Sequence, residues 1–297
     1  MRVVTQVSDL RSLLNAWRRA DDEVSFVPTM GNIHEGHLSL IEEARKRSDR
    51  IVSSIFVNPM QFDRPNDYGR YPRTFEEDKR QLQDAGVDLL FNPPAEVIYP
   101  RGFENSTYVD VPGITDILCG AHRPGHFRGV ATIVCKLFNL VQPKLAVFGE
   151  KDYQQLLVVR RMVEDLNIPV EIVGAPTSRE QNGLAMSSRN NYLSDAERQQ
   201  AALIFQLMCE TAEQVIAGSR DYKILEAKAK QVLAEDGFEP DYFSILTLEG
   251  LNTPSDMSPP DELVVLVAAH LGQARLIDNL PIHQYTALAE SKASHAS

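Results

Sequence analysis

The chain has 297 residues and a formal net charge of −11, with 43% hydrophobic and 24% charged residues. This composition is ordinary for a globular protein, and the length favours two domains. The acidic balance argues against a nucleic-acid partner, because a phosphate backbone needs a basic footprint on the protein. The longest apolar run, residues 263–269, is too short to span a membrane, and the first twenty residues contain no secretory signal pattern. We therefore expect a cytoplasmic protein.

Short apolar runs alternate with helical patterns over residues 1–176. The runs that predict strands are residues 24–27, 51–57, 87–91, 145–148 and 170–173. The patterns that predict helices are residues 37–48, a segment opened by a capping box at Thr74 and Glu77, residues 128–141 and residues 154–166. This alternation favours an α/β domain with a parallel sheet. Because ligands bind at the carboxyl ends of such strands, the loops after Val27, Val57 and Phe148 should share one edge.

The pattern changes over residues 177–285. A capping box at Ser194 and Glu197 predicts a helix that ends near Gly218. A second helix is predicted over residues 222–235, and strands over residues 242–248, 263–268 and 275–277. Helices followed by strands indicate a smaller α+β domain. Residues 286–297 are mostly small and polar, so we expect a flexible tail.

The turn after the first predicted strand has the composition of a phosphate site. It lacks both common glycine-rich nucleotide motifs. Instead, Gly31 and Gly36 allow close approach of the backbone, and a helix start near His37 offers free N–H groups. His34 and His37 can both donate hydrogen bonds there. We expect His37 to act mainly as a cationic donor, with a pKa that the helix start lowers and a bound phosphate raises. The alternative is that both histidines only bond backbone carbonyls, whereas a zinc site lacks a third ligand.

Four further polar clusters flank predicted strands or helices. Lys151, Asp152 and Gln155 follow the strand ending at Phe148, and Gln61 follows the one ending at Val57. The other two are the loop Met186, Ser187, Ser188 and Arg189, and the basic stretch 125–129. An ammonium, hydroxyls and a guanidinium suit phosphate groups. Taken alone, the first three of these clusters favour an ordinary turn, loop or solvated helix start over a binding site.

Together these clusters resemble the pantothenate synthetase (pantoate–β-alanine ligase) family of the nucleotidyltransferase superfamily. The matching motifs are Pro28-Thr29-Met30-Gly31, His34-Glu35-Gly36-His37, Asn58-Pro59-x-Gln61-Phe62, Arg123-Pro124-Gly125-His126-Phe127, Gly149-Glu150-Lys151-Asp152-Tyr153-Gln154-Gln155 and Met186-Ser187-Ser188-Arg189-Asn190. They cover residues 28–190 in the order in which the family has them. The chain length and the two-domain pattern also fit this family.

The resemblance implies a Rossmann-like first domain, a smaller second domain that closes over ATP, and a homodimer. It implies an ATP- and Mg²⁺-dependent condensation of pantoate with β-alanine that releases AMP and pyrophosphate. The implied ATP-binding residues are Met30, Gly31, His34, His37, Gly149, Glu150, Lys151, Asp152, Ser178, Met186, Ser187, Ser188 and Arg189. Of these, His34, His37, Lys151 and Arg189 are the implied catalytic residues, and Gln61 and Gln155 would bind pantoate. Ser178 stands where the family usually has valine beside the adenine.

Two other functions are compatible with parts of this pattern. An adenylyl- or cytidylyltransferase of the same superfamily would keep the nucleotide in its product, and the first motif does not separate it from a ligase. Gln61, Gln155 and the second domain favour the ligase. A non-catalytic nucleotide sensor would need three phosphate-binding loops without turnover, which the clustering disfavours.

Overall fold

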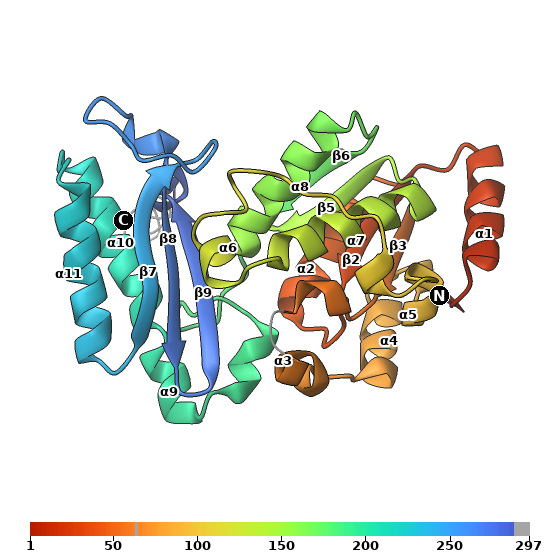
Figure 1. The fold of residues 1–297 in the computed structure, drawn as a ribbon, viewed down its shortest axis with the longest axis horizontal. Coiled ribbons are helices and arrows are strands. Elements are labelled where there is room, and N and C mark those ends of the chain that lie inside the picture. Colours follow the sequence, from red (N-terminus) through yellow and green to blue (C-terminus); the bar gives the residue numbers. More distant parts are fainter. Residues whose placement is uncertain (63–64, 288–297) are drawn as a thin grey trace, which may run out of the picture. The chain divides into compact units, whose positions relative to one another are not determined.

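A computed structural model describes residues 1–62 and 65–287 of the chain. The chain divides into two compact units, Met1–Thr177 and Ser178–Ser297 (Figure 1). We call them the first and the second unit. The tail predicted for residues 286–297 lies, from residue 288 onwards, outside the described residues. In the described ranges, no helix combines the length and the apolar character that a membrane crossing requires.

The first unit is built on a six-stranded sheet with the order β1-β4-β3-β2-β5-β6, in which every pair is parallel. The strands are β1 (Arg2–Val4), β2 (Val24–Thr29), β3 (Arg50–Ile55), β4 (Leu89–Phe91), β5 (Leu145–Gly149) and β6 (Glu171–Ala175). The helices are α1 (Val7–Arg19), α2 (Glu35–Arg45), α3 (Pro65–Arg70), α4 (Phe75–Asp84), α5 (Ala95–Ile98), α6 (Cys119–His122), α7 (His126–Val141) and α8 (Tyr153–Asp165), with 3₁₀ turns η1 (Pro59–Gln61), η2 (Phe103–Asn105) and η3 (Glu150–Asp152). The prediction of a parallel, Rossmann-like sheet is confirmed, although β1 and α1 were not foreseen.

Helices cover both faces of this sheet (Figure 1). On one face, Val27 of β2 belongs to a buried cluster with Ile41 of α2 and Leu82 of α4. On the other face, the neighbouring Phe26 packs edge-on against Phe138 of α7, with ring centroids 6.5 Å apart. Successive side chains of a strand point to opposite faces, so burial on both sides explains why these strands are apolar without alternation.

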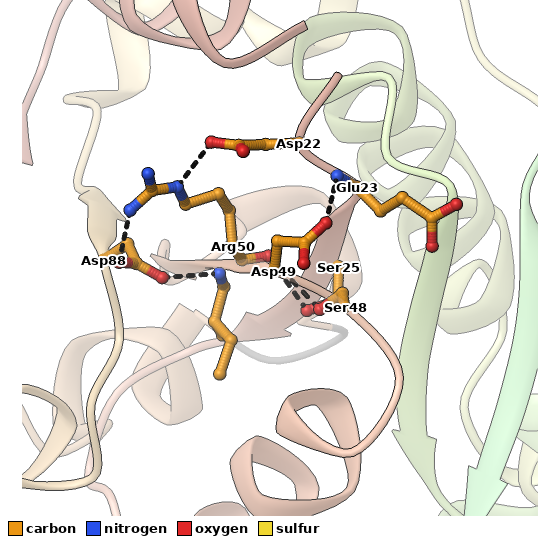
Figure 2. A network of polar contacts seen from close by, with 8 residues as sticks. Asp22, Glu23, Ser25, Ser48, Asp49, Arg50 and Asp88 are labelled. Carbon is orange, nitrogen blue, oxygen red and sulfur yellow. Dashed lines mark hydrogen bonds and ion pairs between the residues drawn. The ribbon is translucent and has the colours of Figure 1, made fainter. Parts of the chain in front are cut away.

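An ionic network joins the amino ends of three neighbouring strands (Figure 2). Arg50, the first residue of β3, donates from Nε to Asp22 just before β2 at 2.7 Å. Its terminal nitrogen lies 3.5 Å from Oδ1 of Asp88, just before β4. The other oxygen of Asp88 accepts the backbone N–H of Ile51 at 2.8 Å. These bonds fix the register of β2, β3 and β4 at the amino ends of the strands, away from their carboxyl ends.

Two predicted features of the helices are wrong. Thr74 and Glu77 form no capping box, because the Thr74 hydroxyl donates to Asp78 (3.1 Å) and the Glu77 carboxylate accepts from Arg80 (2.7 Å). The helix predicted to run from Ser194 to near Gly218 is interrupted at residues 201–202, where the Ile204 N–H bonds the carbonyl three residues back at 3.3 Å. The tightened turn replaces the α-helical bond pattern there.

The second unit is a three-stranded antiparallel sheet in the order β7-β8-β9, with helices α10 and α11 on one face (Figure 1). Its strands are β7 (Glu239–Thr247), β8 (Leu263–Leu271) and β9 (Ala274–Pro281). Its helices are α9 (Asp195–Gln200), α10 (Leu203–Ile216) and α11 (Tyr222–Glu235), with 3₁₀ turns η4 (Ser188–Tyr192) and η5 (Pro260–Glu262). The capping box at Ser194 and Glu197 is confirmed, as is the α+β character.

A buried ion pair anchors the segment that enters the second unit. The guanidinium of Arg179 donates to both oxygens of Asp278, at 2.6 and 3.0 Å, and lies over the ring of Phe205. The Asp278 side chain is only 5% exposed. Removal of one member of a buried pair leaves an uncompensated charge, which costs far more than the loss of an exposed pair.

We predict that Arg179→Ala lowers the free energy of unfolding by about 3 kcal/mol, because it leaves the Asp278 carboxylate buried without a cation. The matched control is Arg128→Ala, which removes the equally short but exposed pair of Arg128 with Asp110. It should cost about 1 kcal/mol or less. Urea denaturation of the two variants checks both values, and equal losses would contradict the assignment.

Candidate active site

His34 is the residue that starts helix α2. It lies at the N-cap with extended backbone, and its ring Nδ1 accepts the N–H of Gly36 at 3.1 Å. The helix therefore begins two residues before the predicted position, and this N–H is not free as expected. Because Nδ1 is an acceptor, the neutral ring carries its hydrogen on Nε2. His34 is thus held in a single tautomer that can donate a hydrogen bond from Nε2.

His37 lies one helical turn further on, beside His34. The two ring centroids are 4.1 Å apart. Nδ1 of His37 is buried and finds no hydrogen-bond partner among the described residues. A buried polar atom without a partner is costly, and this nitrogen is one of seven such side-chain atoms in the described residues.

In this structure the pKa of each histidine lies below its usual value, which favours neutral rings at pH 7 before phosphate binds. Burial lowers the pKa of His34 to about 4, and the nearby charge of Lys151 acts in the same direction. The pKa of His37 is lowered to about 3, mainly by burial, and the neighbouring His34 acts in the same direction. Asp152 opposes both shifts. A neutral imidazole still donates one hydrogen bond, so the positive charge at this edge comes from Lys151 rather than from the rings.

Lys151 and Asp152 lie in the turn that follows β5, near the two histidines. The parallel pairing of β2 with β5 aligns Ser25 with Leu145 and Phe26 with Ala146, so both strands end at the same edge. Lys151 is 15% exposed, and its Nζ lies 3.8 Å from the Asp152 carboxylate. The charges of both residues act on both histidines. The structure therefore brings the first two predicted clusters together.

The two glutamines that begin helix α8 differ in their surroundings. Gln154 is 4% exposed and fully engaged, since it accepts the N–H of Cys119 and donates to the carbonyls of Ile114 and Ile117. Gln155 is half-buried, and in the part of the chain that the structure describes its amide has no hydrogen-bond partner. Gln154 thus holds the chain before α6, and Gln155 remains available to a ligand.

Gln61 lies in a buried chain of polar side chains after β3. Tyr99 donates its hydroxyl hydrogen to Asn58 at 2.7 Å, and Asn58 donates to the side-chain oxygen of Gln61 at 3.2 Å. The amide nitrogen of Gln61 points to the sulfur of Met30, 3.0 Å away. The motif Asn58–Phe62 indicated Gln61, but nothing in the sequence indicated that Tyr99 supports it from a distant segment.

The basic stretch 125–129, together with Arg123 just before it, contacts the main chain of Gln61. The carbonyl of Gln61 lies 2.8 Å from Nδ1 of His126 and accepts from Arg123 at 3.4 Å. Gly129 packs directly on this turn, and a Cβ there would lie 2.5 Å from the carbonyl oxygen of Met60. This stretch therefore fixes the position of Gln61.

The remaining predicted residues share one loop of the second unit. The N–H of Met186 donates to the carbonyl of Ser178 at 2.9 Å, next to an antiparallel bridge between Arg179 and Ala185. Ser187 then caps the 3₁₀ turn η4 by accepting the N–H of Arg189 at 3.2 Å. Ser178 and the segment 186–189 are thus neighbours within this unit.

The described residues contain no cluster of three or more His, Cys, Asp or Glu side chains arranged to hold a metal ion.

Comparison with known proteins gives a consistent result. The family model described as pantoate-beta-alanine ligase matches residues 2–281. The pantothenate synthetase of Shewanella woodyi is 52% identical over 280 residues, which cover 94% of this chain and 99% of that protein. The structure of pantothenate synthetase from Thermus thermophilus matches with a TM-score of 0.87 and 48% identity, over 95% of this chain and 99% of that one.

A second solved relative carries ligands. The pantoate-beta-alanine ligase of Francisella tularensis, in complex with beta-gamma ATP and β-alanine, matches with a TM-score of 0.78 and 33% identity, over 95% of this chain and 98% of that one. The matches to the family model and to these relatives extend over nearly the whole chain. The protein is therefore an enzyme of the ligase class, and its chain belongs to the pantoate-beta-alanine ligase family.

Proposed function

We propose that the protein condenses pantoate with β-alanine at the expense of ATP, through a pantoyl adenylate, and releases AMP and pyrophosphate. One observation carries this proposal: the His34–His37 turn and the Lys151–Asp152 turn meet at the carboxyl ends of β2 and β5. The order of the strands reverses between β2 and β5, and ligands of such sheets bind at this reversal. The ATP analogue and β-alanine bound to the Francisella relative support the same assignment.

The adenylate follows from the chemistry of the acid. A carboxylate does not condense with an amine near pH 7, because the group to be expelled is oxide. Attack of a pantoate carboxylate oxygen on the α-phosphorus of ATP forms the acyl–phosphate bond and expels pyrophosphate. The β-alanine amine then attacks the acyl carbon, and the bond to AMP breaks. Alignment of the reactants in the site should supply much of the acceleration.

ATP would bind with its phosphates against the two turns of the first unit. The N–H on Nε2 of His34 and the ammonium of Lys151 would stabilise the charge that develops on the phosphates. Phosphate binding would also raise the pKa of both histidines from the low values of the free protein. The further ATP contacts would be Met30, Gly31, His37, Gly149, Glu150 and Asp152, together with Ser178, Met186, Ser187, Ser188 and Arg189 of the second unit. This assignment requires the second unit to close over the nucleotide.

Mg²⁺ would be held mainly by the phosphates of ATP, and the carboxylate of Asp152 is a candidate ligand from the first unit. The Asp152 side chain is 45% exposed, which leaves its oxygens accessible. When bound, the ion would neutralise part of the phosphate charge.

Pantoate would bind between Gln61 and Gln155. Asn58 occupies the side-chain oxygen of Gln61, so the Gln61 amide nitrogen is directed to Met30. A thioether is a weak acceptor, and an oxygen of pantoate or β-alanine would therefore readily replace it. Gln155 supplies a second amide on α8. We further propose a homodimeric protein in the cytoplasm, as the family resemblance implies.

An assay of AMP release tests the proposed function. Purified protein with ATP, Mg²⁺, pantoate and β-alanine should release free AMP and form pantothenate, and omission of any one substrate should abolish turnover. A nucleotide conjugate as the product would instead identify a nucleotidyltransferase. No turnover with any combination would leave only nucleotide binding and would refute the ligase assignment for these substrates.

We predict that His37→Ala and Lys151→Ala each lower kcat by about 10²–10³-fold, the usual effect of losing one donor to a transition state. The matched control is Lys144→Ala. Lys144 also flanks β5, but it lies at the other end of the strand and pairs with Glu23. The kcat of Lys144→Ala should stay within twofold of the wild-type value. Steady-state kinetics of the three variants test these values. A kcat of Lys151→Ala within about threefold of the wild-type value would show that Lys151 has no part in the mechanism.

We predict opposite effects for the adjacent glutamines. Gln155→Ala should raise the KM for pantoate about tenfold or more, with little loss of stability, because its amide holds no protein group. Gln154→Ala should lower the melting temperature by several degrees, because it leaves the buried N–H of Cys119 without its acceptor. Kinetics and thermal melts on both variants give the two values. If Gln155→Ala shifts only the KM for ATP, the assignment to pantoate is wrong.

A further inference from the structure

We infer that Asp78 is a positioning residue for the reaction: its buried carboxylate holds the β2–α2 turn in the one conformation that presents His34. This inference rests on the proposed function, because the role of His34 does. Asp78 lies in the first turns of α4 and is 2% exposed. No feature of the sequence around it indicated a role in the site.

The turn has a backbone conformation that needs support. Gly31 has φ +82° and Asn32 has φ +53°, so two consecutive residues are left-handed. Such a conformation is unfavourable for a residue with a Cβ atom unless the surroundings fix it. It also turns the N–H groups of Asn32 and Ile33 toward the interior, where they need an acceptor.

Asp78 supplies that acceptor with both of its oxygens. Oδ2 accepts the N–H of Asn32 at 2.9 Å, and Oδ1 accepts the N–H of Ile33 at 2.8 Å. The hydroxyl of Thr74 donates a third bond to Oδ1 at 3.1 Å. Within the described residues no lysine or arginine pairs with this carboxylate, so these three neutral donors stabilise its charge. The carboxylate and the turn therefore depend on each other.

The carboxylate also packs against the turn. A Cβ on Gly31 would lie 2.9 Å from Oδ2 of Asp78 and 3.2 Å from a methyl carbon of Ile55. The turn thus has little room to shift toward α4. His34 follows Ile33 directly, and its ring bonds the N–H of Gly36 at 3.1 Å. Asp78 consequently determines where the N–H of His34 Nε2 points, although none of its hydrogen bonds reaches the ring.

The decisive variant is Asp78→Asn, which keeps the size of the side chain but replaces one acceptor by an NH₂ group facing a backbone N–H. We expect kcat to fall about 10- to 100-fold, the range expected when a transition-state contact is misplaced. The KM for pantoate should change less than threefold, because Gln61 and Gln155 do not bond Asp78. In ¹⁵N-histidine-labelled protein without substrates, the ring signals of His34 should shift from a single Nε2–H tautomer to a mixture.

Two controls separate positioning from stability. Asp88→Asn alters another aspartate that accepts a backbone N–H, in this case that of Ile51 in β3 at the amino ends of the strands, although Asp88 also pairs with Arg50 (Figure 2). It should lower the melting temperature but leave kcat and the His34 signals unchanged. Thr74→Val keeps both bonds to the turn and should retain kcat within about twofold. If Thr74→Val lost as much activity as Asp78→Asn, the effect would come from α4 itself and the inference would fail.

The inference is also overturned if folded Asp78→Asn keeps kcat within twofold and an unchanged His34 spectrum. Should that variant not fold, Asp78→Glu takes its place, since it retains the charge and displaces the oxygens by one methylene. It should lower kcat at least threefold and shift the His34 signals, and the absence of both changes would contradict the inference. The spectrum needs no substrate, so it remains informative if the proposed reaction itself proves wrong.

Discussion

The parallel pairing of β2 with β5 is the contact on which the candidate site depends. These strands lie far apart in the sequence, yet they are neighbours at the point where the strand order reverses. Connections leave this point in opposite directions, so the two turns that follow the strands face the same space. One turn carries His34 and His37, and the other carries Lys151 and Asp152. The network around Arg50 fixes the sheet at its opposite edge (Figure 2).

Buried polar side chains that bond the main chain give this edge its shape. Asp78 holds the turn before α2, Gln154 holds the segment before α6, and Asn58 connects the Gln61 side chain to the backbone of α7. Each is a satisfied buried group, and such groups define one conformation more sharply than apolar packing does. The groups that we propose to meet a substrate are different. Gln155 is half-buried, and neither its amide nor Nδ1 of His37 has a hydrogen-bond partner among the described residues.

The sequence was sufficient for the features that depend on local pattern. The apolar runs predicted β2 through β6, and the motifs predicted which strand ends carry His34, Gln61 and Lys151. It was insufficient where a distant contact decides. Thr74 looked like a helix cap, but its hydroxyl turns to Asp78, and the two glutamines of α8 could not be told apart without the carbonyls that Gln154 meets. Neutral histidines likewise follow from burial, which a turn sequence does not reveal.

We propose that pantoate is activated as an adenylate before β-alanine reacts. The most direct measurement is the exchange of labelled pyrophosphate into ATP, with Mg²⁺ present and β-alanine omitted. We expect exchange that requires pantoate, because formation of the adenylate is then the only step and is reversible. Most of this exchange should be lost in Lys151→Ala. Exchange that proceeds equally without pantoate, or that appears only after β-alanine is added, would contradict a pantoyl adenylate formed in a separate first step.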